Sequence, residues 1–161
     1  MKPSIGVIGP NNCDPDERRL GFDVGAGIAN AGAVLVCGGL GGMMEAAAEG
    51  AKSKGGTTIG ILPGQSPEDA NSFIDIPVPT GLDVVRNFLV IRASSSVIAV
   101  RGGYGTLTEI AIALRLGIPV IGLRTWTVSR DGLVDPGILT AETPDEAVSK
   151  ALDAMKNRRG N

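Results

Sequence analysis

A glycine-rich stretch from Arg101 to Glu109 holds the residues whose types and spacing are best suited to chemistry. Before it, the apolar run Val97–Val100 is rich in β-branched residues, which is typical of a buried parallel strand. After it, apolar residues recur at helical spacing up to the stop signal Gly117–Pro119. The stretch is therefore predicted to turn from the end of a strand into the start of a helix.

Such a turn is suited to binding an anion. Glycine lacks a Cβ, so the backbone can approach a ligand closely, and the free N–H groups at a helix start attract negative charge. Thr106 could cap the helix or offer its hydroxyl to the anion, while Glu109, one turn later, could face the rest of the ligand. The plain alternative is a tight connection in which Glu109 is only a favourable first-turn acid. The predicted phosphate- or nucleotide-binding residues here are Gly102, Gly103, Tyr104, Gly105 and Thr106.

A second glycine-rich turn follows another expected strand, Ala33–Cys37, and leads into a helix over Met43–Ala51. It adds Gly38, Gly39 and Gly42 to the predicted ligand-binding residues. It is not the dinucleotide-binding fingerprint, which places its glycines after the first strand of the unit. Two such turns in one small domain are hard to explain by connection geometry alone.

Composition excludes several classes of function. The chain has 161 residues, 43% hydrophobic and 20% charged, which predicts one folded domain with a sizeable core. A net charge of −2 and 3% aromatic residues argue against nucleic acid as a partner. With no histidine and two cysteines, no metal site and no histidine-based catalysis are expected. No signal peptide or membrane-spanning run is evident, so we expect a cytoplasmic protein without membrane contact.

Strands and helices alternate along the sequence, which predicts a parallel sheet covered by helices on both faces. The fold class is therefore α/β, a Rossmann-like, doubly wound and mostly parallel sheet, in a single domain over residues 1–161 with a polar tail at 155–161. The segment Trp126–Thr140 is predicted to be irregular. The other expected strands are Ser4–Ile8, Thr57–Leu62, Ile74–Val78 (at an edge, because of Pro77) and Pro119–Leu123.

The segment from Thr80 to Arg92 is predicted to be one helix, opened by a capping box at Thr80–Asp83. Its apolar residues form a wide arc, with Arg86 just beside the arc and Arg92 inside it. That placement predicts a partly buried ion pair or a subunit interface at Arg92.

Taken together, Gly38-Gly-x-x-Gly42-x-Met44, Arg86 and Gly102-Gly-Tyr-Gly-Thr106-x-x-Glu109 resemble the LONELY GUY (LOG) family. The wider group includes proteins labelled "possible lysine decarboxylase" and the molybdenum cofactor carrier protein. The resemblance implies a phosphoribohydrolase that splits a nucleoside 5′-monophosphate into free base and ribose 5-phosphate, without a cofactor. It implies the 5′-phosphate on Gly102, Gly103, Gly105 and Thr106. It also implies Arg86 and Glu109 as the catalytic pair at the sugar, and a homo-oligomer, most simply a dimer.

The chain departs from the LOG pattern at three positions. Arg101 stands where LOG enzymes usually have proline, Asn87 where they have lysine, and Thr108 where they have a second acid. These features are closer to the carrier-protein branch of the group. The alternative is therefore a non-catalytic binding or carrier protein for a phosphorylated ligand, such as a nucleotide or the molybdenum cofactor. Lysine decarboxylation is set aside, because no lysine stands at a predicted strand end to hold pyridoxal phosphate.

Overall fold

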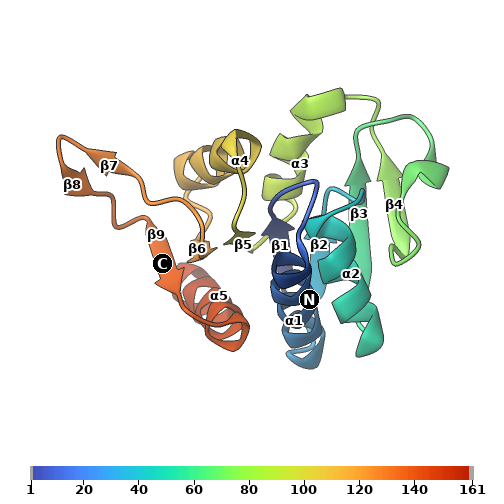
Figure 1. Cartoon of the computed structure of the whole chain (residues 1–161), viewed down its shortest axis with the longest axis horizontal. Helices are drawn as coiled ribbons and strands as arrows, with labels where there is room; N and C mark the ends of the chain where they lie inside the picture. The colour runs from blue at the N-terminus through green and yellow to red at the C-terminus, as the bar shows by residue number, and fades with distance from the viewer. Residues whose placement is uncertain (1, 160–161) are drawn as a thin grey trace.

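Seven runs of mostly β-branched and small apolar residues pair side by side into one parallel sheet. The computed structural model describes residues 2–159, and Figure 1 shows the sheet between two layers of helices. The strand order is β4-β3-β2-β1-β5-β6-β9, with every pairing parallel. The strands of this sheet are β1 (Ser4–Ile8), β2 (Val34–Cys37), β3 (Thr58–Leu62), β4 (Ile76–Pro79), β5 (Ser96–Val100), β6 (Val120–Leu123) and β9 (Ile138–Ala141).

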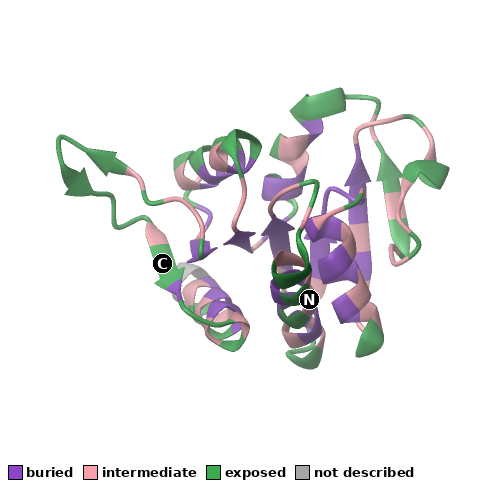
Figure 2. Cartoon of the chain, viewed as in Figure 1, coloured by how far each residue is buried: buried purple, intermediate pink, exposed green. Residues whose placement is uncertain are grey.

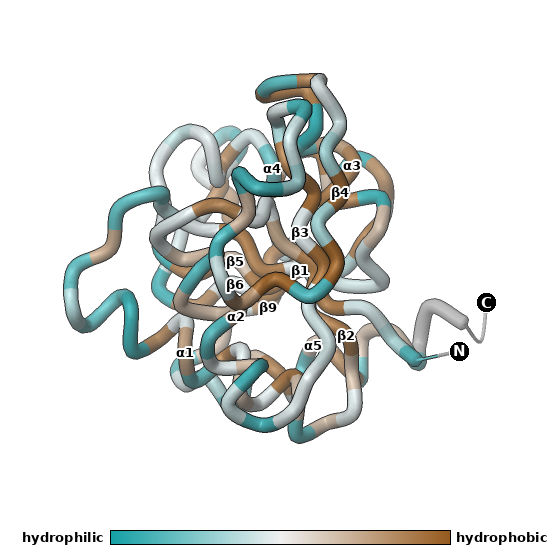
Figure 3. The backbone as a smooth tube through the Cα atoms, turned by 90° about the vertical axis from the view of Figure 1, so that its right-hand side faces the viewer, coloured by the Kyte–Doolittle hydropathy of each residue, from teal (hydrophilic) through white to brown (hydrophobic). Residues whose placement is uncertain are grey.

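Five α-helices cover the two faces of the sheet. One face carries α1 (Pro15–Asn30), α2 (Met43–Ser53) and α5 (Pro144–Arg159), and the other carries α3 (Asn87–Arg92) and α4 (Tyr104–Arg115) (Figure 1). Each face has its own buried apolar cluster, and the central strands are buried from both sides (Figure 2). The same strands form the hydrophobic centre of the tube in Figure 3. The predicted Rossmann-like α/β fold is confirmed.

The order of the strands decides where a ligand can bind. From β1 the chain builds outward to β2, β3 and β4 on one side, then crosses back so that β5, β6 and β9 continue the sheet on the other side. In open α/β sheets of this kind, the crevice lies at the carboxyl ends of the strands on either side of that reversal. Here those strands are β1 and β5, and β5 is followed by the predicted anion-binding turn.

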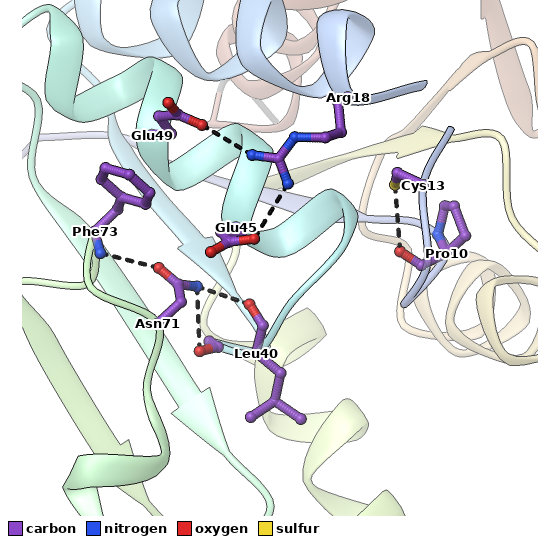
Figure 4. Close-up of polar contacts among 9 residues, drawn as sticks. Pro10, Cys13, Arg18, Leu40, Glu45, Glu49, Asn71 and Phe73 are labelled. Atoms are coloured by element: carbon purple, nitrogen blue, oxygen red, sulfur yellow. Dashed lines mark hydrogen bonds and ion pairs between the residues drawn. The ribbon is translucent and has the colours of Figure 1, made fainter. Parts of the chain in front are cut away.

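Helices α1 and α2 are joined at their polar surfaces as well as in the core. Arg18 on α1 contacts two carboxylates on α2, with Nη1 3.1 Å from Glu45 Oε2 and Nη2 3.0 Å from Glu49 Oε2 (Figure 4). At the start of α1, Asp14 and Glu17 form a capping box: each side chain accepts a hydrogen bond from the other residue's backbone N–H. Pro15 stands at the first helical position, where its missing N–H removes no intrahelical hydrogen bond.

The predicted single helix over Thr80–Arg92 is wrong. A 3₁₀ helix, η2 (Asp83–Arg86), precedes α3, and no side chain caps either start. The Thr80 hydroxyl donates to the Leu62 carbonyl and accepts the N–H of Leu82, and Asp83 has a left-handed backbone with φ 49°. The capping box therefore does not form. Arg92 is exposed, and the ion pairs among residues 2–159 do not include it.

The segment Trp126–Thr140 is more regular than predicted. It contains a short hairpin, β7 (Ser129–Arg130) with β8 (Leu133–Val134), turned at Asp131-Gly132 and projecting from the body at the left of Figure 1, and then the edge strand β9. The predicted tail at 155–161 is largely helical, because α5 runs to Arg159 and buries Met155 against the core. Residues 160–161 lie outside the described part. Within that part, no helix has the length and hydropathy needed to cross a bilayer.

Candidate functional site

A cleft of about 520 Å³ opens at the carboxyl edge of the sheet, where the strand order reverses. The loop after β1, the turn after β2, the 3₁₀ helix η2 and the first turn of α4 form its walls. Six of the predicted site residues line it: Gly38, Arg86, Gly103, Gly105, Thr106 and Glu109. The fold thus brings residues as far apart in sequence as Gly38 and Glu109 to one crevice.

The start of α4 presents unpaired backbone donors to this cleft. Gly103 is the N-cap residue, and no side chain caps the helix. The first N–H groups of any helix have no intrahelical partner, and here they lie beside a concave surface at the positive end of the helix dipole. The arrangement is suited to an anion such as phosphate.

The fold requires glycine at only one of the three glycine positions of this turn. Gly102 has φ +98°, and a Cβ there would lie 2.2 Å from Thr106 Oγ1, so the turn itself requires glycine. At Gly103 and Gly105 a Cβ would meet no atom within 4 Å, and neither residue has positive φ. The packing of this chain therefore gives no reason for glycine at these two positions.

Thr106 is the third residue of α4 and is buried, so it is not the helix cap that the sequence suggested as one option. Tyr104, in contrast, is 80% exposed and does not line the cleft, and its ring centroid lies 5.6 Å from that of Trp126. The indole Nε1 of Trp126 donates to the Gly103 carbonyl over 3.1 Å. Tyr104 and Trp126 thus support the outer side of the turn.

Arg86 is buried with only 7% of its surface exposed, where the sequence had placed it beside the apolar arc. Its guanidinium lies over Gly38: a Cβ on that residue would come within 2.6 Å of Nη1 and 2.7 Å of Nη2. Nη1 donates to Asn87 Oδ1 over 2.6 Å, while Nε has no hydrogen-bond partner among the described residues. The ion pairs of that same part of the chain do not include Arg86 either. A buried cation without an anion is costly, and this one faces the cleft.

Glu109 lies in the same cleft with 8% of its surface exposed. Burial raises the pKa of this carboxyl from 4.5 to about 7, against the opposing effect of the nearby Arg86 charge. Burial also lowers the pKa of Arg86, partly offset by Glu109. The charges of the two groups shift each other's pKa, although the groups form no ion pair within residues 2–159. Because the pKa of Glu109 is about 7, this carboxyl exists in both protonation states near neutral pH.

The glycine turn between β2 and α2 is mainly structural. Gly42 has φ +63°, and a Cβ there would lie 2.3 Å from the Asn11 carbonyl oxygen. The first N–H of α2, on Met43, donates to the Pro10 carbonyl, so part of this helix start is satisfied by protein. Asn71 Nδ2 donates to the carbonyls of Gly39 and Leu40, which fixes the turn from the other side (Figure 4). Gly39 and Gly42 do not line the cleft, whereas Gly38 does, by making room for Arg86.

The sequence reasoning missed several polar residues of the cleft. Asn11 and Asn12 come from the loop after β1, Asp83 from η2, and Asn87 from the start of α3. The loop after β1 could have been found, because it follows a strand next to the reversal of strand order. Asp83 could not, because the predicted continuous helix hid the left-handed turn that carries it.

A model of the SLOG cluster4 family matches residues 2–148, most of the chain. The chain belongs to the SLOG cluster4 family. It is also 44% identical over 150 residues to an uncharacterized protein of Archaeoglobus fulgidus, covering 93% of this chain and 95% of that one. The narrower resemblance to LOG enzymes stays a prediction.

Solved structures similar to this family member are found among molybdenum cofactor proteins. The molybdenum cofactor binding protein from Rippkaea orientalis is 34% identical, with a TM-score of 0.85 and coverage of 95% of this chain and 97% of that chain. The molybdenum cofactor carrier protein from Chlamydomonas reinhardtii is 33% identical, with a TM-score of 0.85 and coverage of 96% and 99%. DNA processing protein A from Helicobacter pylori is 20% identical with a TM-score of 0.69, covering 94% of this chain and 80% of that one, a likeness that shows the fold alone.

Proposed function

We propose that this protein binds a small phosphorylated ligand in the cleft at the start of α4 and acts as its carrier. The observation that carries the proposal is the pair Gly103 and Gly105, which line the cleft although neither packing nor backbone conformation calls for glycine there. Gly103 is the N-cap, where glycine is favoured over alanine, but Gly105 lies inside the helix, where glycine is less stable than alanine by roughly 0.5–1 kcal/mol. Close approach of a ligand to the backbone accounts for this cost, because a Cβ would occupy the space in front of the free N–H groups.

Arg86 is a second feature of the cleft that favours an anionic ligand. Its buried guanidinium has no carboxylate partner among the described residues, and an anionic ligand in the cleft would compensate its charge. Arginine binds phosphate through several parallel N–H donors, so it can hold a ligand as well as neutralise it. Asn11, Asn12 and Asn87 add amide donors and acceptors that suit the ring edges of a nucleobase or a similar heterocycle.

The similar proteins support a carrier role for a protein with this binding site. Two proteins that share about a third of the sequence over nearly the whole chain are described as binding or carrying the molybdenum cofactor. We therefore include a phosphorylated cofactor of that kind, beside nucleotides, among the ligands to test as cargo. The net charge of −2 keeps nucleic acid an unfavoured partner.

Phosphoribohydrolase activity is the second candidate, and Glu109 is the observation that favours it. A carboxyl group with a pKa of about 7 is suited to general acid–base catalysis near neutral pH. In its ionised form it could also stabilise the positive charge that develops on ribose during N-glycosidic cleavage. Incubation with a panel of nucleoside 5′-monophosphates, followed by chromatography for free base, separates the two functions. Base released at many turnovers per protein favours the hydrolase, and tight binding without release favours the carrier.

The binding itself is tested with Gly105→Ala. This variant is expected to raise the free energy of unfolding by up to roughly 1 kcal/mol, and to weaken monophosphate binding at least about tenfold because the Cβ blocks the N–H groups. Ala111→Gly, at an exposed position of the same helix, is the matched control: it should lower stability and leave affinity unchanged. Unchanged affinity in a stable Gly105→Ala protein would show that the turn is only a connection.

A further inference from the structure

A second cleft, of about 540 Å³, lies on the other side of the Gly102–Gly103 turn. It is formed by Arg101 and Gly102 after β5, by Arg124 to Thr127 after β6, and by Pro10 and Glu17. Pro10 lines both clefts. Of the two neighbouring glycines, Gly103 lines the first cleft and Gly102 lines the second. The two hollows are therefore neighbours along the carboxyl edge of the sheet, with the start of α4 between them.

Two arginines give this second cleft its charge. Arg101 directly follows β5 and Arg124 directly follows β6, and these strands are paired in register up to Val100 and Leu123. The Arg101 N–H also donates to the Leu123 carbonyl, so the two arginines extend from neighbouring strand ends. Across residues 2–159, neither is a member of an ion pair. Glu17 is the single carboxylate in the lining, so two arginines against one glutamate leave the cleft with a net positive charge.

Both arginines also have the same uncommon backbone conformation. Each has φ +52°, in the left-handed region that residues with a Cβ rarely adopt. The Nε of Arg101 is buried and, within the described part of the chain, has no hydrogen-bond partner. The Thr125 hydroxyl donates to the Arg101 carbonyl and so holds this conformation. Such outliers are commonly retained at sites where a side chain must be held for a ligand.

An aromatic wall completes the cleft. Trp126 lines it and packs against Tyr104, with an angle of 34° between the rings. Trp126 is the only tryptophan of the chain and Tyr104 the only tyrosine. The hydrogen bond from Trp126 to the Gly103 carbonyl ties this wall to the anion-binding turn of the first cleft.

We propose that the second cleft binds a second anionic group of the same ligand, a phosphate beyond the one held at the start of α4. The preferred ligand class is then a nucleoside diphosphate or a comparable molecule with two linked anionic groups. Arg101 and Arg124 hold the second group, and Trp126 packs beside it. The proposal rests on the proposed function, because it takes the first phosphate to lie at the α4 N-terminus between the two clefts.

The test compares the 5′-mono- and 5′-diphosphates of the four common ribonucleosides by titration, with Trp126 fluorescence and calorimetry as readouts. At least one diphosphate should bind about tenfold or more tightly than its monophosphate, as expected for an added charge-assisted contact. Arg124→Gln should remove most of that preference and change monophosphate affinity by less than about twofold. Arg115→Gln, exposed at the far end of α4, removes the same charge and should leave the preference intact.

Equal affinity for mono- and diphosphates, or an equal loss for both in Arg124→Gln, would overturn the second subsite while leaving the first. If no nucleotide binds, the nucleotide reading of the proposed function fails. The affinities for inorganic pyrophosphate and orthophosphate then test the second subsite on its own. Tighter binding of pyrophosphate that Arg124→Gln abolishes supports the subsite, and equal affinities refute it. Arg101→Gln provides an independent repeat, and circular dichroism shows whether that variant folds.

Discussion

Glu109→Gln should stabilise the ligand-free protein in a strongly pH-dependent way. Glu109 is buried beside an arginine with which it forms no ion pair, and its pKa is raised from 4.5 to about 7. The folded protein therefore binds this proton more tightly than the unfolded chain does. Stability is fully retained below about pH 4.5, declines as the pH rises to about 7 and levels off above it, because the unfolded chain ionises first.

The size of the effect follows from the two pKa values. The difference between about 7 and 4.5, at about 1.4 kcal/mol per pH unit, gives a penalty of roughly 3 kcal/mol at pH 8 and almost none at pH 4.5. Glutamine has nearly the same shape and no charge, so it removes the penalty. For a chain of this length, 3 kcal/mol corresponds to a rise in melting temperature of roughly 6–12 °C.

The assay is thermal unfolding of the parent and of Glu109→Gln between pH 4.5 and 8.5, with circular dichroism as the readout. The gain in melting temperature should be near zero at the acid end, grow up to about pH 7 and level off above it. Glu142→Gln, an exposed glutamate outside the cleft, is the matched control and should show no such trend. A gain that is the same at every pH, or no gain at pH 8, would refute the account of Glu109 as a desolvated, unpaired carboxyl.

The remaining predictions concern the glycine turns, the catalytic alternative and assembly. Gly38→Ala should displace the Arg86 guanidinium and weaken monophosphate binding at least about tenfold by calorimetry, whereas a variant that binds like the parent would remove Arg86 from the site. Gly42→Ala should lower the free energy of unfolding by roughly 3 kcal/mol or more in urea titration, because of its φ and the clash with the Asn11 carbonyl; a loss under 1 kcal/mol contradicts this. If a monophosphate is hydrolysed, Glu109→Gln should reduce turnover roughly a hundredfold, and full activity would exclude Glu109 as the catalytic group. Light scattering at micromolar concentration should show a dimer, as the apolar side chains exposed on η2 predict, with Val84→Asp shifting it to monomer; a monomeric parent ends that proposal.

The central part of the fold could be predicted from the sequence because each of its signals is local. Buried parallel strands are continuous apolar runs, and Asp14-Pro15 with Glu17 marks the start of α1 without reference to the rest of the chain. Strand β9 escaped prediction because it is a short edge strand whose middle residues, Leu139 and Thr140, are exposed and give no continuous apolar run.

The turns that form the candidate site could be predicted from the sequence, but the positions of its side chains could not. The strand-to-helix pattern around Gly103 located the α4 turn, but helical periodicity could not show that Arg86 is buried. That burial depends on Gly38, which comes from the end of another strand and leaves space for the guanidinium. The break before α3 was hidden for a similar reason, because the Thr80 hydroxyl is taken by the Leu62 carbonyl of β3.

The measurement that tests the central claim most directly is calorimetric titration of the protein with nucleoside 5′-monophosphates and with the same nucleosides lacking phosphate. If the α4 N-terminus and Arg86 bind the phosphate, at least one monophosphate should bind roughly a hundredfold more tightly than its nucleoside, as two or more charge-assisted contacts would give. The preference should shrink in Gly105→Ala and persist in Ala111→Gly. A monophosphate and a nucleoside of equal affinity, or a preference that Gly105→Ala leaves intact, would contradict the claim that this turn is the anion-binding site.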